Sequence, residues 1–219
     1  MAGRHTFSEA LEKLHRDLLN MGALVEEAIH LSVKSLATRD LALAEQVIRD
    51  DDEIDNLNLS IERDCFRLIA LQQPMASDLR RIGTVLKVVT DLERMADNAV
   101  TIAKATIRLK EETYVKQLID IPKMATLAEA MVREALNAYI NLDTEKAYQV
   151  GRNDDEVDAL YKHIHNELLE LMKKNPDTVH QATQFLFVAH SLERIADHAT
   201  NLGEWVIYLV TGKIEEIND

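Results

Sequence analysis

Four acidic residues of this chain are spaced so that they could hold cations. Glu93 and Asp97 lie in one segment, and Glu193 and Asp197 lie in a second segment with the same pattern. A separation of four residues places two side chains on one face of an α-helix. Carboxylates gathered in this way suit Mg²⁺, Ca²⁺, Mn²⁺ or iron, and zinc is a further candidate. The spacing therefore predicts a metal site in each segment.

An aspartate-rich segment accompanies each of these pairs. Residues 51–55 read DDEID, and residues 154–158 read DDEVD 103 positions later. Matched pairs at this offset run back to Met21 and Met124, so the chain is an internal duplication. The secondary ligand candidates in the two segments are Asp52, Asp55, Asp155 and Asp158.

The turn at Pro74 relates the two acidic segments of the first copy. Asp55 lies 19 residues before Pro74 and Glu93 lies 19 residues after it, so antiparallel helices would hold both at one height. Pro176 has a similar place in the second copy. The same antiparallel relationship across the turn at residues 38–40, and across its counterpart in the second copy, adds two weaker ligand candidates, Glu26 and Glu129. Each copy is therefore expected to gather carboxylates from several helices at mid-height.

A structural interpretation of the same acidic pairs remains open. Glu93 falls about 40° from Val89 on a helical wheel, inside the apolar arc, where an unpaired carboxylate is costly. Pairing with Arg94, or with Arg194 in the second copy, would satisfy the charge without a metal. His198 has Asn98 as its counterpart, so any role of this histidine is confined to the second copy and a place in the core or on the surface is favoured.

Other residues suggest alternatives that the sequence disfavours. Glu27 and His30 form a lone ExxH pattern of the kind that diiron oxidases of the ferritin-like class use, but Arg133 stands where a second histidine would be needed. Cys65 lies beside Phe66 in an apolar stretch and is expected in the core rather than as a nucleophile. The sequence has no phosphate-binding loop and no hydrolase motif, so no catalytic centre is expected. A purely structural helical interaction protein is the other alternative.

Six long helices are expected to position these residues, because apolar residues recur at three- and four-residue spacing. Asp40 is expected to cap the second helix, Pro74 and Pro176 are expected to follow helix ends, and Pro122 is expected in the first turn of a helix. The expected helices are 9–37, 41–72, one that begins near Ser77 or Asp78, 122–141, 144–173 and 177–210. Short connections make neighbouring helices antiparallel. We therefore predict an all-α fold of two tandem three-helix bundles, formed by residues 1–112 and 113–219.

Composition narrows the cellular setting. The chain has 219 residues, is 47% hydrophobic and carries a formal net charge of −13, which disfavours direct contact with nucleic acid. A single cysteine and a charged N-terminal region without a signal peptide indicate the cytoplasm. No apolar run is long enough to cross a bilayer, so membrane contact is expected only through protein partners.

The duplicated motif resembles that of the PhoU family. The family carries an E(D)xxxD motif on the third helix of each bundle, matched here by residues 93–97 and 193–197. Residues 73–80, QPMASDLR, are similar to the family's turn in the first bundle, whereas residues 177–180, DTVH, depart from it. The resemblance spans nearly the whole chain.

By this resemblance, the chain would be a non-enzymatic negative regulator of phosphate uptake and of the phosphate regulon. It would act as an adaptor between the ATPase subunit of the phosphate ABC transporter and a phosphate sensor histidine kinase. The resemblance further implies a homodimer that is peripheral at the inner face of the membrane through these partners. Its motif carboxylates would bind iron, zinc, manganese or magnesium.

Overall fold

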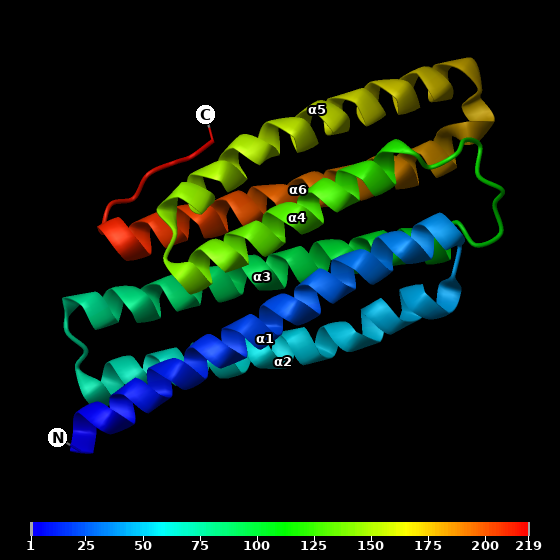
Figure 1. Ribbon diagram of the computed structural model, residues 1–219. Coiled ribbons are helices and arrows are strands. Elements are labelled where there is room, and N and C mark those ends of the chain that lie inside the picture. The colour runs from blue at the N-terminus through cyan, green and yellow to red at the C-terminus, as the bar shows by residue number, and fades with distance from the viewer. Residues whose placement is uncertain (1, 219) are drawn as a thin grey trace.

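Six long helices account for most of the chain, as Figure 1 shows. The computed structural model describes residues 2–218, and the side chains of residues 7–218. One short 3₁₀ turn, η1 (Pro176–Thr178), precedes the last helix. The helices are α1 (Ala2–Thr38), α2 (Leu41–Gln72), α3 (Ala76–Arg108), α4 (Asp120–Asn141), α5 (Thr144–Lys174) and α6 (Val179–Thr211).

The helices form two antiparallel three-helix bundles that lie lengthwise against each other (Figure 1). Helices α1 to α3 make the first bundle, and α4 to α6 make the second. Helix α3 packs along α6, and α1 contacts α4. The predicted all-α fold of two three-helix bundles is thus confirmed. No helix in the described part of the chain is long and apolar enough to cross a membrane.

The turns between helices follow local sequence preferences. The carboxylate of Asp40 accepts hydrogen bonds from the amides of Ala42 and Leu43 at 3.0 and 3.2 Å, which confirms the predicted cap. Four helix starts differ from the expected ones: α1 begins at Ala2 rather than 9, α3 at Ala76 rather than 77 or 78, α4 at Asp120 rather than 122, and α6 at Val179 rather than 177. The last difference arises because Pro176 starts a 3₁₀ turn that Asn175 caps.

A continuous apolar core runs through both bundles. Leu18 and Met21 of α1 are fully buried, as is Phe185 of α6. Gly22 marks a close approach of α1 to α4, because a Cβ atom there would lie 2.8 Å from Cδ1 of Leu136. The two bundles therefore share one hydrophobic core and do not form separate globular domains.

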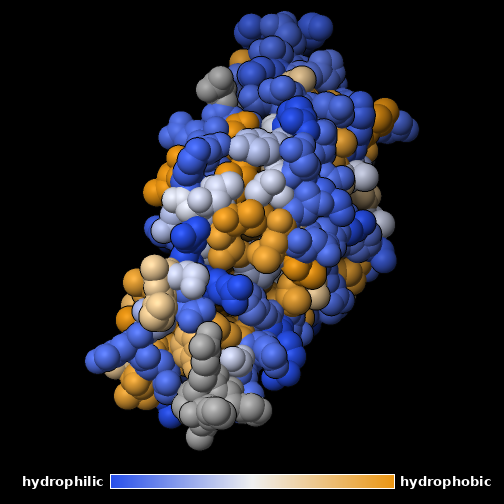
Figure 2. Space-filling model, turned by 60° about the vertical axis from the view of Figure 1, so that its left-hand side comes forward, coloured by the Kyte–Doolittle hydropathy of each residue, from blue (hydrophilic) through white to orange (hydrophobic). Residues whose placement is uncertain are grey.

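Apolar surface also gathers at the end of the molecule that carries the α2–α3 and α4–α5 turns, as Figure 2 shows. Exposed apolar side chains near these turns are Leu71, Met75, Leu79, Ile140, Leu142 and Val210. A hollow of about 300 Å³ lies between His15, Tyr139 and Leu142. This end of the molecule is a surface at which apolar contact with another protein would bury solvent-exposed area.

Candidate metal centres in the two bundles

The first bundle brings four carboxylates together from two helices. Asp51 and Asp55 belong to α2, and Glu93 and Asp97 belong to α3. Burial raises the pKa of Asp51 to about 6, and the negative charges of the other three add to the rise, while Lys104 opposes it. We call these four residues the first cluster.

Glu93 is affected by the charges of two other members of the first cluster. Burial raises the pKa of its carboxyl group, the charges of Asp97, Asp55 and Glu62 raise it further, and Arg94 lowers it. The Nε atom of Arg94 lies 3.4 Å from Glu93 Oε2, and its Nη1 atom lies 3.8 Å from Asp97 Oδ2. Arg94 therefore supplies a loose and exposed countercharge, as the structural interpretation expected, but it does not cancel the clustered negative charge.

Two polar side chains beside the first cluster were not among the ligand candidates predicted from the sequence. Asn58 and Glu62 follow Asp55 on the same face of α2, at the three- and four-residue spacing of a helix stripe. The Oδ1 atom of Asn58 is buried and has no hydrogen-bond partner among the described residues. A buried acceptor of this kind is costly unless it gains a donor or a cation.

Asp52 was predicted from the sequence as a ligand candidate, whereas the structure places its neighbour Asp51 in the cluster. Asp52 is exposed on α2. Asp51 lies four residues after Val47 and three before Ile54, both buried, so it shares the inward face of the helix. The same shift applies to the second bundle, where Asp154 is buried and Asp155 is exposed. The period of the buried residues could have identified Asp51 and Asp154.

The second bundle repeats the arrangement with Asp154 and Asp158 of α5 and Glu193 and Asp197 of α6, which we call the second cluster. Burial raises the pKa of Asp154 to about 6; a hydrogen bond from Asn218 lowers it, and Asp197 and Asp158 raise it. Burial likewise raises the pKa of Asp197, with Glu193 as the largest charge contribution. The charge of Asp155 makes the smallest of these contributions to the raised pKa of Asp154.

Glu193 has the carboxylate oxygen that is best placed to bind a cation in the second cluster. Its Oε2 atom is buried and has no hydrogen-bond partner among the described residues. The Nδ1 atom of His190 lies 3.1 Å away, without the geometry of a hydrogen bond. A buried carboxylate oxygen in this state favours a positively charged ligand. The second cluster therefore fits a metal ion by its donor chemistry.

The two clusters differ in the donors that surround the shared carboxylates. In the first cluster the flanking groups are Asn58, Glu62 and Thr90, all oxygen donors, and the Thr90 hydroxyl donates to the Leu86 carbonyl at 2.9 Å. In the second bundle His165 matches Glu62 and His190 matches Thr90. The rings of His165 and His190 both lie 6.1 Å from the ring of Tyr161. Nitrogen donors thus flank only the second cluster.

The carboxylates of both clusters are spread more widely than ligands that hold an ion. Among the described residues, the only group whose ligand atoms all lie within 4.8 Å of one another is Asp120, His163 and Glu167, at the α4–α5 contact. Lys116 already pairs with Glu167 there. The first bundle has the matching contacts of Lys13 with Asp17 and Asp64 at 2.9 and 2.7 Å.

The lysine of each contact therefore takes the place that a cation would need. Lys13 and Lys116 are related by the internal duplication, as are their acidic partners. His163 replaces Ser60 and is exposed, with its Nε2 atom 3.9 Å from Asp120. In the first bundle this ion pair joins α1 to α2, and in the second bundle it joins the segment before α4 to α5.

Glu26 and Glu129, the weaker ligand candidates, take part in contacts between the two bundles. Glu26 accepts a hydrogen bond from Nε of Arg133 at 3.1 Å, and His30 Nδ1 lies 3.6 Å from Glu129. Both contacts cross from α1 to α4, because these residues face the other bundle. Their role is to join the bundles. The same contact engages His30 and leaves Glu27 exposed, so the ExxH pair does not face a bundle interior.

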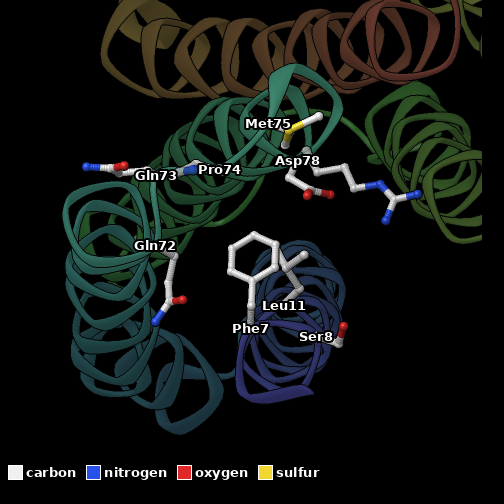
Figure 3. Close-up of a pocket in the computed structure, with 9 residues that line it drawn as sticks. Phe7, Ser8, Leu11, Gln72, Gln73, Pro74, Met75 and Asp78 are labelled. Carbon is white, nitrogen blue, oxygen red and sulfur yellow. The ribbon is translucent and has the colours of Figure 1, made fainter. Parts of the chain in front are cut away.

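Two further features carry no reactive chemistry. Cys65 is fully buried, and burial, with the charges of Asp64 and Glu62, raises the pKa of its thiol to about 12. A hollow of about 480 Å³ at the end of the first bundle is lined by Gln73, Pro74, Met75 and Asp78 of the segment 73–80. Figure 3 shows Phe7 and Leu11 of α1 facing this hollow, opposite Gln72 and the start of α3.

The fold and these sites define a class of duplicated helical proteins with one carboxylate cluster in each bundle. The family model described as "PhoU domain" matches residues 18–106 and again residues 121–206. This chain therefore belongs to the PhoU family.

Similar proteins and a similar crystal structure agree with this assignment. The chain is 46% identical over 99% of both chains to a protein of Clostridium acetobutylicum named phosphate-specific transport system accessory protein PhoU homolog. A Caulobacter vibrioides protein of the same name is 39% identical, over 95% of this chain and 91% of that protein. The crystal structure of PhoU from Pseudomonas aeruginosa matches with a TM-score of 0.92 and 38% identity, covering 94% of this chain and 100% of that one. The chain is thus a non-enzymatic accessory or regulatory protein.

Proposed function

We propose that this protein is a negative regulator of phosphate uptake and of the phosphate regulon. The proposal rests on sequence identity, over 99% and 95% of this chain, to two proteins whose names describe them as accessory to phosphate-specific transport. Both duplicated ExxxD segments fall within the matched regions. A relationship of this extent supports a shared role rather than a shared fold alone.

In this role the protein is an adaptor with two partners. One is the ATPase subunit of the phosphate ABC transporter, and the other is a phosphate sensor histidine kinase. The exposed apolar end of the molecule supports the assignment, because adaptors need surface that a partner can bury. The protein acts in the cytoplasm, reaches the membrane through these partners, and forms a homodimer. Its two units are residues 1–112 and 113–219.

Metal ions bind to the two carboxylate clusters and neutralise their charge. Buried oxygens of Asn58 and Glu193 that accept no hydrogen bond from the described residues support this part of the proposal. The all-oxygen first cluster suits magnesium, manganese or iron, whereas the histidines beside the second cluster favour zinc or iron. Bound ions would stabilise the folded state by mass action and could thereby couple metal supply to regulation.

Copurification and elemental analysis test the two parts separately. The purified chain should retain the tagged ATPase subunit and the kinase on a column, and its gene should repress a phosphate-regulon reporter in a strain that lacks it. Elemental analysis should find metal that is absent after replacement of Glu93, Asp97, Glu193 and Asp197 by alanine. Loss of metal with intact partner binding would assign the clusters to stability, and failure of both partner captures would refute the adaptor role.

A further inference from the structure

Residues 213–218 return from the end of α6 and lie across α5 and α6 (Figure 1). The Ile217 amide donates to Oε1 of Glu204 at 3.0 Å, and the Tyr148 hydroxyl donates to Oε2 of Glu215 at 2.6 Å. The Asn218 side-chain amide donates to Oδ2 of Asp154. The segment is thus held by two helices and places a neutral donor on one carboxylate of the second cluster.

Two glycines form the seat for this segment. A Cβ atom at Gly151 would lie 2.8 Å from the Ile217 carbonyl oxygen, so only glycine admits the backbone at this distance. A Cβ atom at Gly203 would lie 3.1 Å from Cδ1 of Ile217. The matching positions of the first bundle are Ile48 and Ala103. The close approach is therefore a property of the second bundle.

The covered and uncovered clusters differ in the exposure of the same aspartate. Asp154 is 5% exposed, whereas Asp51 at the matching position is only partly buried. The Asn218 amide occupies an oxygen of Asp154 that a cation would otherwise use. A hydrogen bond to a charged group stabilises the ion-free state, so the Asn218 amide competes with a metal ion that approaches that oxygen.

We propose that residues 213–218 are a lid on the second cluster, and that a cation binds Asp154 only by displacing the Asn218 amide. The proposal rests on the proposed metal-binding role of the clusters. The lid makes the two clusters unequal: the first is open to cations at all times, and the second takes up an ion when the segment is released. Release then exposes Glu204 and the glycine seat, so occupancy of the second cluster changes the surface that a partner meets.

The test measures Mn²⁺ binding by titration calorimetry at pH 8 in the full-length chain. Glu93 and Asp97 are first replaced by alanine, so that only the second cluster reports. In this background, Asn218→Ala and Gly151→Ala should each tighten Mn²⁺ binding roughly tenfold, because the competing hydrogen bond or the seat is lost. Neither change removes core packing, and alanine favours the helix at 151. Asn141→Ala, whose amide bonds Asn137 within α4, is the matched control.

A second measurement follows the lid itself. Saturating Mn²⁺ should increase hydrogen exchange at the Ile217 amide and its neighbours, since displacement frees the bond to Glu204. The opposite background, with Glu193 and Asp197 replaced by alanine, should show no effect of Asn218→Ala on Mn²⁺ binding. That result would place any effect of the segment in the second bundle.

The outcomes separate the lid from the cation site. Equal or weaker Mn²⁺ binding in both lid variants, with clear binding in the parent background, would overturn the lid and leave the proposed metal site in place. Binding that emerges only in the lid variants would support the lid strongly. Absence of Mn²⁺ binding in the parent background and in both lid variants would refute the second metal site and the lid together.

Discussion

The Nδ1 atom of His198 in α6 lies 3.0 Å from Oδ1 of Asp91 in α3, and the two side chains are only 14% and 13% exposed. The Nδ2 atom of Asn201 lies 3.5 Å from the same oxygen. This pair crosses between the bundles. His198 corresponds to Asn98 in the duplication and Asp91 to Ser191, so this histidine–aspartate contact occurs once and not twice.

Removing His198 should weaken the joint between the bundles. His198→Ala leaves the Asp91 carboxylate nearly buried with one distant amide, so we expect a loss of about 2–3 kcal/mol in the free energy of unfolding. Urea denaturation at neutral pH measures it. The double variant Asp91→Ser with His198→Asn reproduces the residues of the opposite half and should recover most of the loss. A single variant as stable as the parent would contradict the buried pair.

The contact between Tyr139 and His15 should make stability depend on pH. The tyrosine oxygen lies 2.7 Å from Nδ1 of His15, and burial, with the charge of Arg81, lowers the pKa of this histidine. The unfolded chain therefore binds the proton more readily, so stability should fall as pH decreases through about 6.5. His15→Gln should reduce this fall, and Tyr139→Phe should cost about 1 kcal/mol at pH 8. Urea denaturation at pH 8 and pH 5.5 compares the variants, and an unchanged pH profile in His15→Gln would refute the assignment.

Neutralising Asp51 should stabilise the metal-free protein. Its pKa is about 6 in the folded chain, and a folded-state pKa above the unfolded value of 3.8 means that stability is lost as pH rises between these values. Asp51→Asn removes this repulsion. Since the side chain is partly solvated, we expect a gain on the order of 1 kcal/mol at pH 7.5 and almost none at pH 4. Thermal unfolding with a chelator present measures it, and the exposed neighbour Asp52→Asn should show no gain.

Exchanging Thr90 and His190 should change the metal preference of the clusters. The Nδ1 atom of His190 lies 3.1 Å from Oε2 of Glu193, so His190→Thr should weaken Zn²⁺ binding to the second cluster by at least about tenfold with little effect on Mg²⁺. Thr90→His should strengthen Zn²⁺ binding to the first cluster. Competition titrations in backgrounds that retain a single cluster distinguish the two sites. Equal Zn²⁺ affinity in parent and variants would show that the histidine is not a donor.

The thiol of Cys65 should be inert in the native protein. The residue is fully buried, and its pKa of about 12 leaves almost no thiolate at pH 8. An aromatic disulfide reagent should therefore react only as fast as the protein unfolds. Rapid modification under native conditions would show that the core opens around α2.

Much of the fold could be predicted because its determinants are local. The helix period, the Asp40 cap and the breaks at Pro74 and Pro176 each depend on a few neighbouring residues. Duplication added a second, independent copy of each of these features. Only the helix starts near the prolines and at Ala2 were misplaced, where a cap or a short turn decides the boundary.

Other parts of the site depend on the rotation of each helix about its axis. Asp51 and Asp52 differ by about 100° on the helix, and packing against α3 turns the first of them inward. Glu26 and Glu129 face the opposite bundle because α1 packs on α4, a contact that no sequence period encodes. Height along a bundle could be counted from the turns, but the direction of a side chain could not.

The sequence by itself determined the duplicated helices, the two turns that fold each copy back on itself, and the acidic segments that face each other across them. Only the tertiary structure decided which carboxylates meet, that His198 pairs with Asp91, and that residues 213–218 cover Asp154. The reason is physical: period and capping act over one or two helical turns, whereas these contacts join residues that only the packing of one bundle on another brings together.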